Sequence, residues 1–137
     1  MAKDNLSGIW QSHYRFTSSS RGGEYEAWHY VLIHHKDNQV IIESLSGVNH
    51  SYLMMRLSLD EQILTGTWQE TTDPAGYYKG STYYGAIQAV IRTPEHIDGR
   101  WVGVDKERQV QTGPWELTYV GKELPAGAAA PQVAKAN

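Results

Sequence analysis

Apolar and polar residues alternate along most of the chain, in short runs separated by Gly, Pro, Asn and Asp. In residues 8–17, Trp10, Ser12, Tyr14 and Phe16 share one face, because residues two apart in a strand point the same way. Similar runs follow almost to position 120, and none has the spacing of an amphipathic helix. The pattern predicts eight β-strands, at residues 8–17, 24–35, 39–45, 51–59, 63–71, 82–92, 97–104 and 110–120.

Four of the five tryptophans, Trp10, Trp68, Trp101 and Trp115, follow a glycine by two positions. In a strand, such a glycine lies on the same face as its tryptophan and leaves room beside the large ring. We therefore expect the four indoles to gather at one end of a closed barrel and to plug it.

The predicted fold class is all-β, a single eight-stranded antiparallel up-and-down β-barrel formed by residues 1–120. Closure removes the two exposed edges that a flat meander of eight strands would leave. A β-sandwich is the competing architecture, but it requires longer crossing connections than the tight turns seen here. Residues 121–137 are rich in Ala, Pro and Gly without periodicity, and we expect a mobile tail there.

The composition narrows the functional classes. The 137 residues carry a net charge of −3 without a basic patch, so we expect no nucleic-acid partner. Cysteine is absent, which excludes disulfides, thiol catalysis and Cys-zinc sites. No apolar run follows the first residues, so we expect a cytoplasmic protein with neither signal peptide nor membrane partner. Nine Tyr and five Trp against one Phe favour a wall that is both apolar and hydrogen-bonding. A monomer and a homodimer both stay open.

An eight-stranded barrel can hold one small ligand in its interior. If the tryptophans point inward, Tyr14 and Glu70 do so as well. The inward face is ambiguous in residues 24–35 and 82–92, where we assign His29, Tyr84 and Gln88 to the interior. Loops 18–23 and 73–81 are expected to cover the mouth away from the tryptophan plug. The candidate ligand-binding residues are Tyr14, Arg21, Trp28, His29, Glu70, Tyr78, Tyr84 and Gln88.

Their expected roles differ. The ring surface comes from Tyr14, Tyr84 and, at the rim only, Trp28, whose parity is opposite to that of His29. The polar end of the ligand meets His29, Glu70 and Gln88. Arg21 closes over an anionic ligand group, and Tyr78 belongs to a lid.

Three functions stay open at this point. The leading one is a sensor or carrier that binds a small, partly apolar and aromatic molecule. The second is a cofactor-free isomerase or cyclase in which His29 and Glu70 form an acid–base pair. The third is a protein-interaction module that uses exposed aromatic surface. For the site itself, a structural alternative also stays open, in which His29, Glu70 and Gln88 satisfy one another in a closed hydrogen-bond network. No catalytic motif, metal-ligand spacing or cofactor motif is present, so we expect no metal and no cofactor.

Two resemblances add to this. Gly8-Ile9-Trp10, at the start of an eight-strand meander, resembles the calycins, which include the lipocalins and avidins. Only Ser12 and Tyr14 could be matched to biotin contacts of avidins, so biotin binding is not implied. Five segments are similar to the β-rich C-terminal half of certain bacterial helix-turn-helix regulators: Ser19-Ser20-Arg21-Gly22, Trp28-His29-Tyr30, Thr65-Gly66-Thr67-Trp68, Gly76-Tyr77-Tyr78-Lys79-Gly80 and Thr112-Gly113-Pro114-Trp115-Glu116-Leu117. That resemblance implies an intracellular sensor or binding module without the DNA-binding half.

Overall fold

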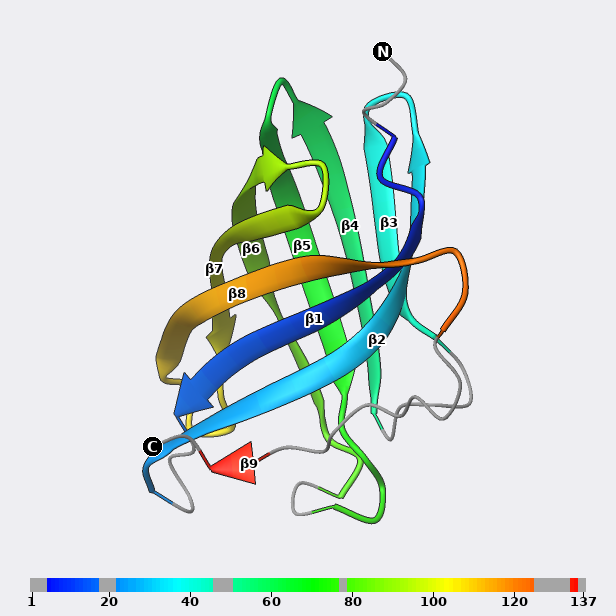
Figure 1. Ribbon diagram of the computed structural model, residues 1–137. Coiled ribbons are helices and arrows are strands. Elements are labelled where there is room, and N and C mark those ends of the chain that lie inside the picture. Colours follow the sequence, from blue (N-terminus) through cyan, green and yellow to red (C-terminus); the bar gives the residue numbers. More distant parts are fainter. Residues whose placement is uncertain (1–4, 18–21, 46–50, 77–78, 125–133, 136–137) are drawn as a thin grey trace.

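The computed structural model describes residues 5–17, 22–45, 51–76, 79–124 and 134–135, and over these ranges the regular elements are all strands (Figure 1). In chain order they are β1 (Gly8–Thr17), β2 (Glu24–Lys36), β3 (Gln39–Ser44), β4 (Tyr52–Asp60), β5 (Ile63–Thr71), β6 (Thr82–Thr93), β7 (His96–Val104), β8 (Val110–Gly121) and β9 (Ala134–Lys135). In these ranges no helix is long and apolar enough to cross a membrane.

The strands form one closed barrel. Each of β1 to β8 pairs antiparallel with its neighbour in sequence, and β1 pairs with both β2 and β8. The predicted eight-stranded up-and-down antiparallel barrel is therefore confirmed. The short β9 lies within residues 121–137 and pairs with Tyr25 and Glu26 of β2.

The wall of the barrel is paired unevenly along β2. On one side, β2 is paired with β1 over residues 24–33. On the other side, pairing with β3 begins only at Val31, and the amide of Leu45 donates to the carbonyl of Tyr30. Among the described residues, positions 27–29 thus have no backbone partner on the β3 side.

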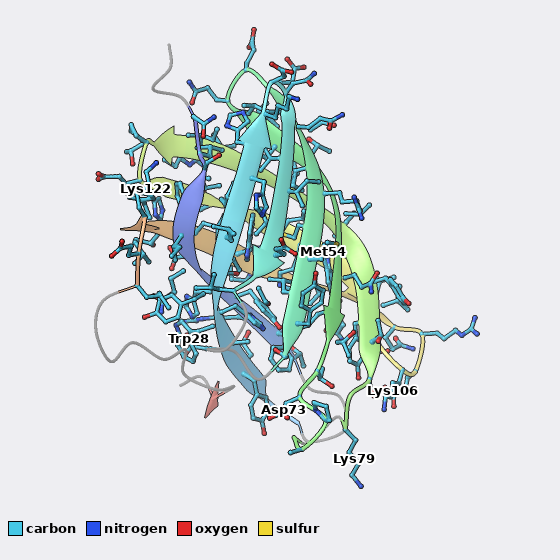
Figure 2. The ribbon with its side chains drawn as sticks, turned by 90° about the vertical axis from the view of Figure 1, so that its right-hand side faces the viewer. Trp28, Met54, Asp73, Lys79, Lys106 and Lys122 are labelled. Atoms are coloured by element: carbon cyan, nitrogen blue, oxygen red, sulfur yellow. The ribbon has the colours of Figure 1, made fainter. Side chains whose placement is uncertain are left out.

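The two ends of the barrel differ. The turn end carries the β2–β3, β4–β5 and β6–β7 turns, and the loop end carries the other connections, with Asp73, Lys79 and Lys106 visible there (Figure 2). Apolar side chains fill the barrel toward the turn end, where Leu6, Ile33 and Leu64 are almost completely buried. Polar interior side chains are concentrated toward the loop end, where β1, β2 and β5 contribute Tyr14, His29 and Glu70.

The alternation predicted the inward faces of most strands. The residues of β1, β2, β5, β7 and β8 that were expected inside are buried or half-buried, among them Ser12, His29, Glu70, Trp101 and Trp115.

The assignment for β6 is wrong. Tyr84 is 62% exposed, and Gln88 lies on the outer face, where its amide donates to Thr65. Apolar residues occupy both faces of β6, so alternation alone could not choose between them. The pairing with β5 decides which face points inward, because residues paired across two strands share a face. Trp68 is paired with Gly85 and Gly66 with Ile87, so Gly85 and Ile87 point inward and Tyr84 and Gln88 point outward.

The predicted plug of four indoles is also wrong. Trp68 and Trp101 contact each other edge to face at 5.7 Å, and Trp68 lies against Gly103 near the loop end of β7. Trp10 lies toward the turn end, where it donates to the carbonyl of Leu6 and packs on Tyr119. Parity fixes which face a residue occupies, but the stagger between tilted strands decides its height in the barrel.

Candidate functional site

A network of four polar side chains crosses the interior of the barrel. The hydroxyl of Tyr14 on β1 donates to Oε1 of Glu70 on β5. The hydroxyl of Ser51, directly before β4, donates to the other carboxylate oxygen, Oε2, at 3.3 Å. Nε2 of His29 on β2 lies 2.6 Å from Ser51 Oγ and 3.5 Å from Glu70 Oε2. Side chains from β1, β2 and the residue before β4 thus converge on the carboxylate of Glu70 on β5, a residue that is 8% exposed.

The protons in this network can be placed by counting donors and acceptors. An ionised carboxylate only accepts hydrogen bonds, so the protons of Tyr14 and Ser51 both point toward Glu70. Because the single proton of Ser51 is used in this way, its oxygen must accept from His29. The Nε2 atom of His29 therefore carries the proton, and Nδ1 is left as a bare acceptor.

That second ring nitrogen has no partner. The Nδ1 atom of His29 is buried and makes no hydrogen bond to any described residue, and the His29 side chain is only 2% exposed. Burial lowers the pKa of His29 below its ordinary value of 6.5, an effect that the Glu70 carboxylate opposes only in part. The imidazole is therefore neutral at neutral pH, with a free lone pair on Nδ1.

This protonation state makes stability depend on pH. The unfolded chain takes up a proton on His29 below pH 6.5, whereas the folded chain resists it down to a lower pH. The contribution to the free energy of unfolding is thus present above pH 6.5 and decreases as the pH falls from there toward the folded-state pKa. We expect the melting temperature to fall more steeply between about pH 7 and pH 5 for the wild type than for His29→Gln. His34→Gln, at an exposed histidine, is the control and should retain the wild-type slope; equal slopes for wild type and His29→Gln would contradict the assignment.

Aromatic rings surround the network. The Tyr14 ring is nearly parallel to the His29 imidazole, with 6.2 Å between centroids, and Trp101 meets Tyr14 edge-on at 6.3 Å. Phe16 lies between Tyr14 and Tyr25, with centroid distances of 6.0 Å and 5.8 Å. The site is therefore a small polar group set in an aromatic wall.

The arrangement is not a hydrolytic triad. In a Ser-His-acid triad, the serine and the acid bind opposite nitrogens of the imidazole. Here Ser51 and Glu70 both lie at Nε2 of His29. Ser51 also donates its proton toward the carboxylate, so no base is positioned to activate it as a nucleophile.

The structure brings together three of the predicted site residues, Tyr14, His29 and Glu70. It places Tyr84 and Gln88 outside the barrel, and Trp28 stacks on His13 on the outer face at 4.9 Å. Arg21 and Tyr78 lie outside the described residues.

Sequence reasoning missed Ser51. It shares the parity of Leu53 and Met55, so extending the inward alternation of that run by one step would have found it. Thr72, two residues after Glu70, has a buried hydroxyl without a partner among the described residues.

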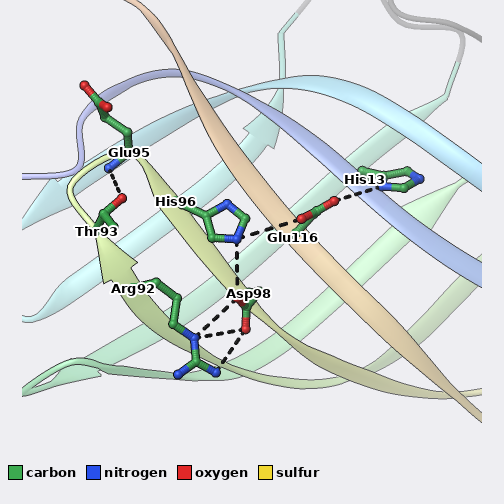
Figure 3. Close-up of polar contacts among 7 residues, drawn as sticks. All are labelled: His13, Arg92, Thr93, Glu95, His96, Asp98 and Glu116. Carbon is green, nitrogen blue, oxygen red and sulfur yellow. Dashed lines mark hydrogen bonds and ion pairs between the residues drawn. The ribbon is translucent and has the colours of Figure 1, made fainter.

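A second polar cluster lies on the outer face of β1, β2, β6, β7 and β8, and most of it is drawn in Figure 3. His13 contacts Glu26 at 2.7 Å. It also contacts Glu116 at 3.3 Å, and this second contact is drawn in Figure 3. His96 contacts Asp98 at 3.3 Å, and the guanidinium of Arg92 donates to the same carboxylate and lowers its pKa. No group of three or more potential ligands in the described part of the chain could hold a metal ion. Exposed ion pairs of this kind contribute little to stability.

No family model matches the chain, and no curated protein or solved structure shows significant similarity to it. The closed barrel is compatible with a calycin-like architecture, and the comparisons confirm an association neither with the calycins nor with the regulators.

Proposed function

We propose that this protein is a sensor or carrier that binds a small, partly apolar molecule inside the loop end of the barrel. The observation that carries the proposal is the unpartnered Nδ1 atom of His29. A buried polar atom without a partner is costly, and native proteins satisfy nearly all of them with protein, water or ligand. The protein groups around His29 are already committed to Glu70, so a ligand is the partner that fits.

The surroundings support the same function. Ring surface from Tyr14, Phe16 and Tyr25 suits an apolar or aromatic ligand body. We assign the ligand to the interior near the loop end because apolar side chains fill the barrel toward the turn end. The network fixes His29 through Ser51 and Glu70, so the acceptor atom is positioned before the ligand arrives.

Native mass spectrometry of the purified protein tests this proposal. We expect a bound small molecule in the wild type, its loss in His29→Ala, and its retention in Gln88→Ala. Gln88 is the matched control because its side chain lies on the outer face. His29→Ala leaves both donors to Glu70 in place but removes a buried ring, so some loss of stability is expected in either case, and the presence or absence of the co-purified molecule is the deciding readout.

The contrary result is equally clear. If His29 serves only a structural network, its removal should destabilise the protein by about 1–3 kcal/mol and leave binding of the co-purified molecule unchanged.

One observation also favours a second function, that of a cofactor-free isomerase. A neutral imidazole whose Nδ1 lone pair is free can accept a proton from a bound substrate, with Glu70 stabilising the resulting cation. Once native mass spectrometry has identified the bound molecule, an activity assay separates the two functions. Incubation of the protein with the identified molecule would convert it in the wild type and not in His29→Ala.

A further inference from the structure

The network determines what kind of polar group its ligand must offer. The hydroxyl protons of Tyr14 and Ser51 are donated to Glu70, and the Nε2 proton of His29 is donated to Ser51. All three side-chain donors are thus used within the network. The positions that stay free are hydrogen-bond acceptors. They are Nδ1 of His29 and the lone pairs of the Glu70 carboxylate that do not accept from Tyr14 or Ser51. A ligand that fits must bring hydrogen-bond donors.

The charge of the site points in the same direction. Glu70 is buried, and within the described residues its ion-pair partner is His29 alone, with no Lys or Arg. Because His29 is neutral, the carboxylate charge is not balanced there. Buried charges in proteins are normally paired, since an unpaired one loses its hydration without compensation. A ligand carrying a positive charge would supply the missing partner.

The aromatic wall is compatible with such a ligand. Cations are attracted to the faces of aromatic rings, and Tyr14, Phe16 and Tyr25 form a continuous series of ring contacts beside the carboxylate. The same wall accommodates the apolar part of the molecule. An anionic ligand would instead meet Glu70 across a short distance and find no free donor.

We propose, building on the proposed function, that the ligand is a small organic amine whose protonated nitrogen donates to the Glu70 carboxylate and whose apolar part packs on the aromatic rings. Because Glu70 lies at Nε2 of His29, a second donor of the ligand, and not the same nitrogen, binds Nδ1. This reverses the charge expected from the sequence, where Arg21 was matched to an anionic ligand group.

A matched set of three probes tests the proposal on the full chain. Phenethylamine, phenethyl alcohol and phenylacetate share a ring and a short linker but differ in charge. We expect isothermal titration to show that phenethylamine binds at least about tenfold more tightly than either of the others. Glu70→Gln should remove this preference, whereas Glu43→Gln, at a carboxylate on the outer face of β3, should retain it. Tyr14→Phe keeps the carboxylate and should also retain the preference, which covers the case in which Glu70→Gln does not fold.

Each other result has a definite meaning. Equal or tighter binding of the alcohol or of phenylacetate would overturn the amine inference and leave the proposed function standing. If no probe binds, the charge of the co-purified molecule decides: a cation supports the inference, and a neutral or anionic molecule overturns it. Absence of both probe binding and a co-purified molecule would overturn the inference and the proposed function together.

Discussion

Replacing Gly85 by alanine is expected to prevent the barrel from closing normally between β6 and β7. A Cβ atom at this position would lie 1.8 Å from the carbonyl oxygen of Val102 and 2.5 Å from the indole nitrogen of Trp68. Neither neighbour can move freely, because Trp68 Nε1 donates to the carbonyls of Ala86 and Val102 at 3.2 Å and 3.1 Å. Overpacking costs about 1–3 kcal/mol where side chains can adjust, and a clash with backbone should exceed that range.

Urea denaturation measures this effect. Gly76→Ala is the matched control, because the nearest atom to its added Cβ would be 3.3 Å away, in Asp73. We expect Gly85→Ala to be poorly folded or to lose more than about 3 kcal/mol of its free energy of unfolding, and Gly76→Ala to stay near the wild type. Equal stability of the two variants would show that Trp68 does not occupy the space above Gly85.

Truncating Trp115 to alanine is expected to cost at least about 3–5 kcal/mol in the free energy of unfolding. The ring is 2% exposed, and its Nε1 atom donates to the hydroxyl of Ser12 at 2.8 Å. Ser12 is completely buried, so removal of the indole leaves both a cavity and a hydroxyl without its partner. The unpaired hydroxyl adds about 1–3 kcal/mol.

Two further variants separate these contributions. Trp115→Phe retains an aromatic ring but loses the donor and part of the ring volume. Ser12→Ala in the Trp115→Phe background removes the stranded hydroxyl and should recover the part of the loss that is due to it. Tyr84→Ala is the control, because that ring is 62% exposed and its truncation should change stability by less than about 0.5 kcal/mol. A large effect at Tyr84 would contradict the assignment of β6.

Much of the fold could be predicted from the sequence, because a barrel wall with one buried face imposes a period of two on every strand. Trp10, Ser12 and Tyr14 illustrate this, and so do His29 and Glu70 in their own strands. This alternation cannot identify the buried face of a strand in which both faces carry apolar residues. On β6, Tyr83 and Tyr84 are equivalent by composition, and only the pairing of Gly85 with Trp68 separates them.

Only part of the candidate site could be predicted, because alternation gives the face of a residue and not its contacts. Parity placed Tyr14, His29 and Glu70 inside the barrel, but it could not show that the hydroxyl of Tyr14 reaches a carboxylate 56 positions away in sequence. That contact depends on strand tilt and stagger, as does the height of each indole. The unpaired Nδ1 of His29 follows from the direction of every hydrogen bond in the network, which no sequence pattern contains.

The one-sided pairing of β2 bears on how a ligand could reach His29. Residues 27–29 are hydrogen-bonded to β1, and on the β3 side no described backbone group holds them. Residues 31–33 of β2 are paired with both β1 and β3, so parting the wall there breaks backbone hydrogen bonds. Beside residues 27–29, a sideways approach to the buried imidazole breaks no backbone hydrogen bond of β2 among the described residues.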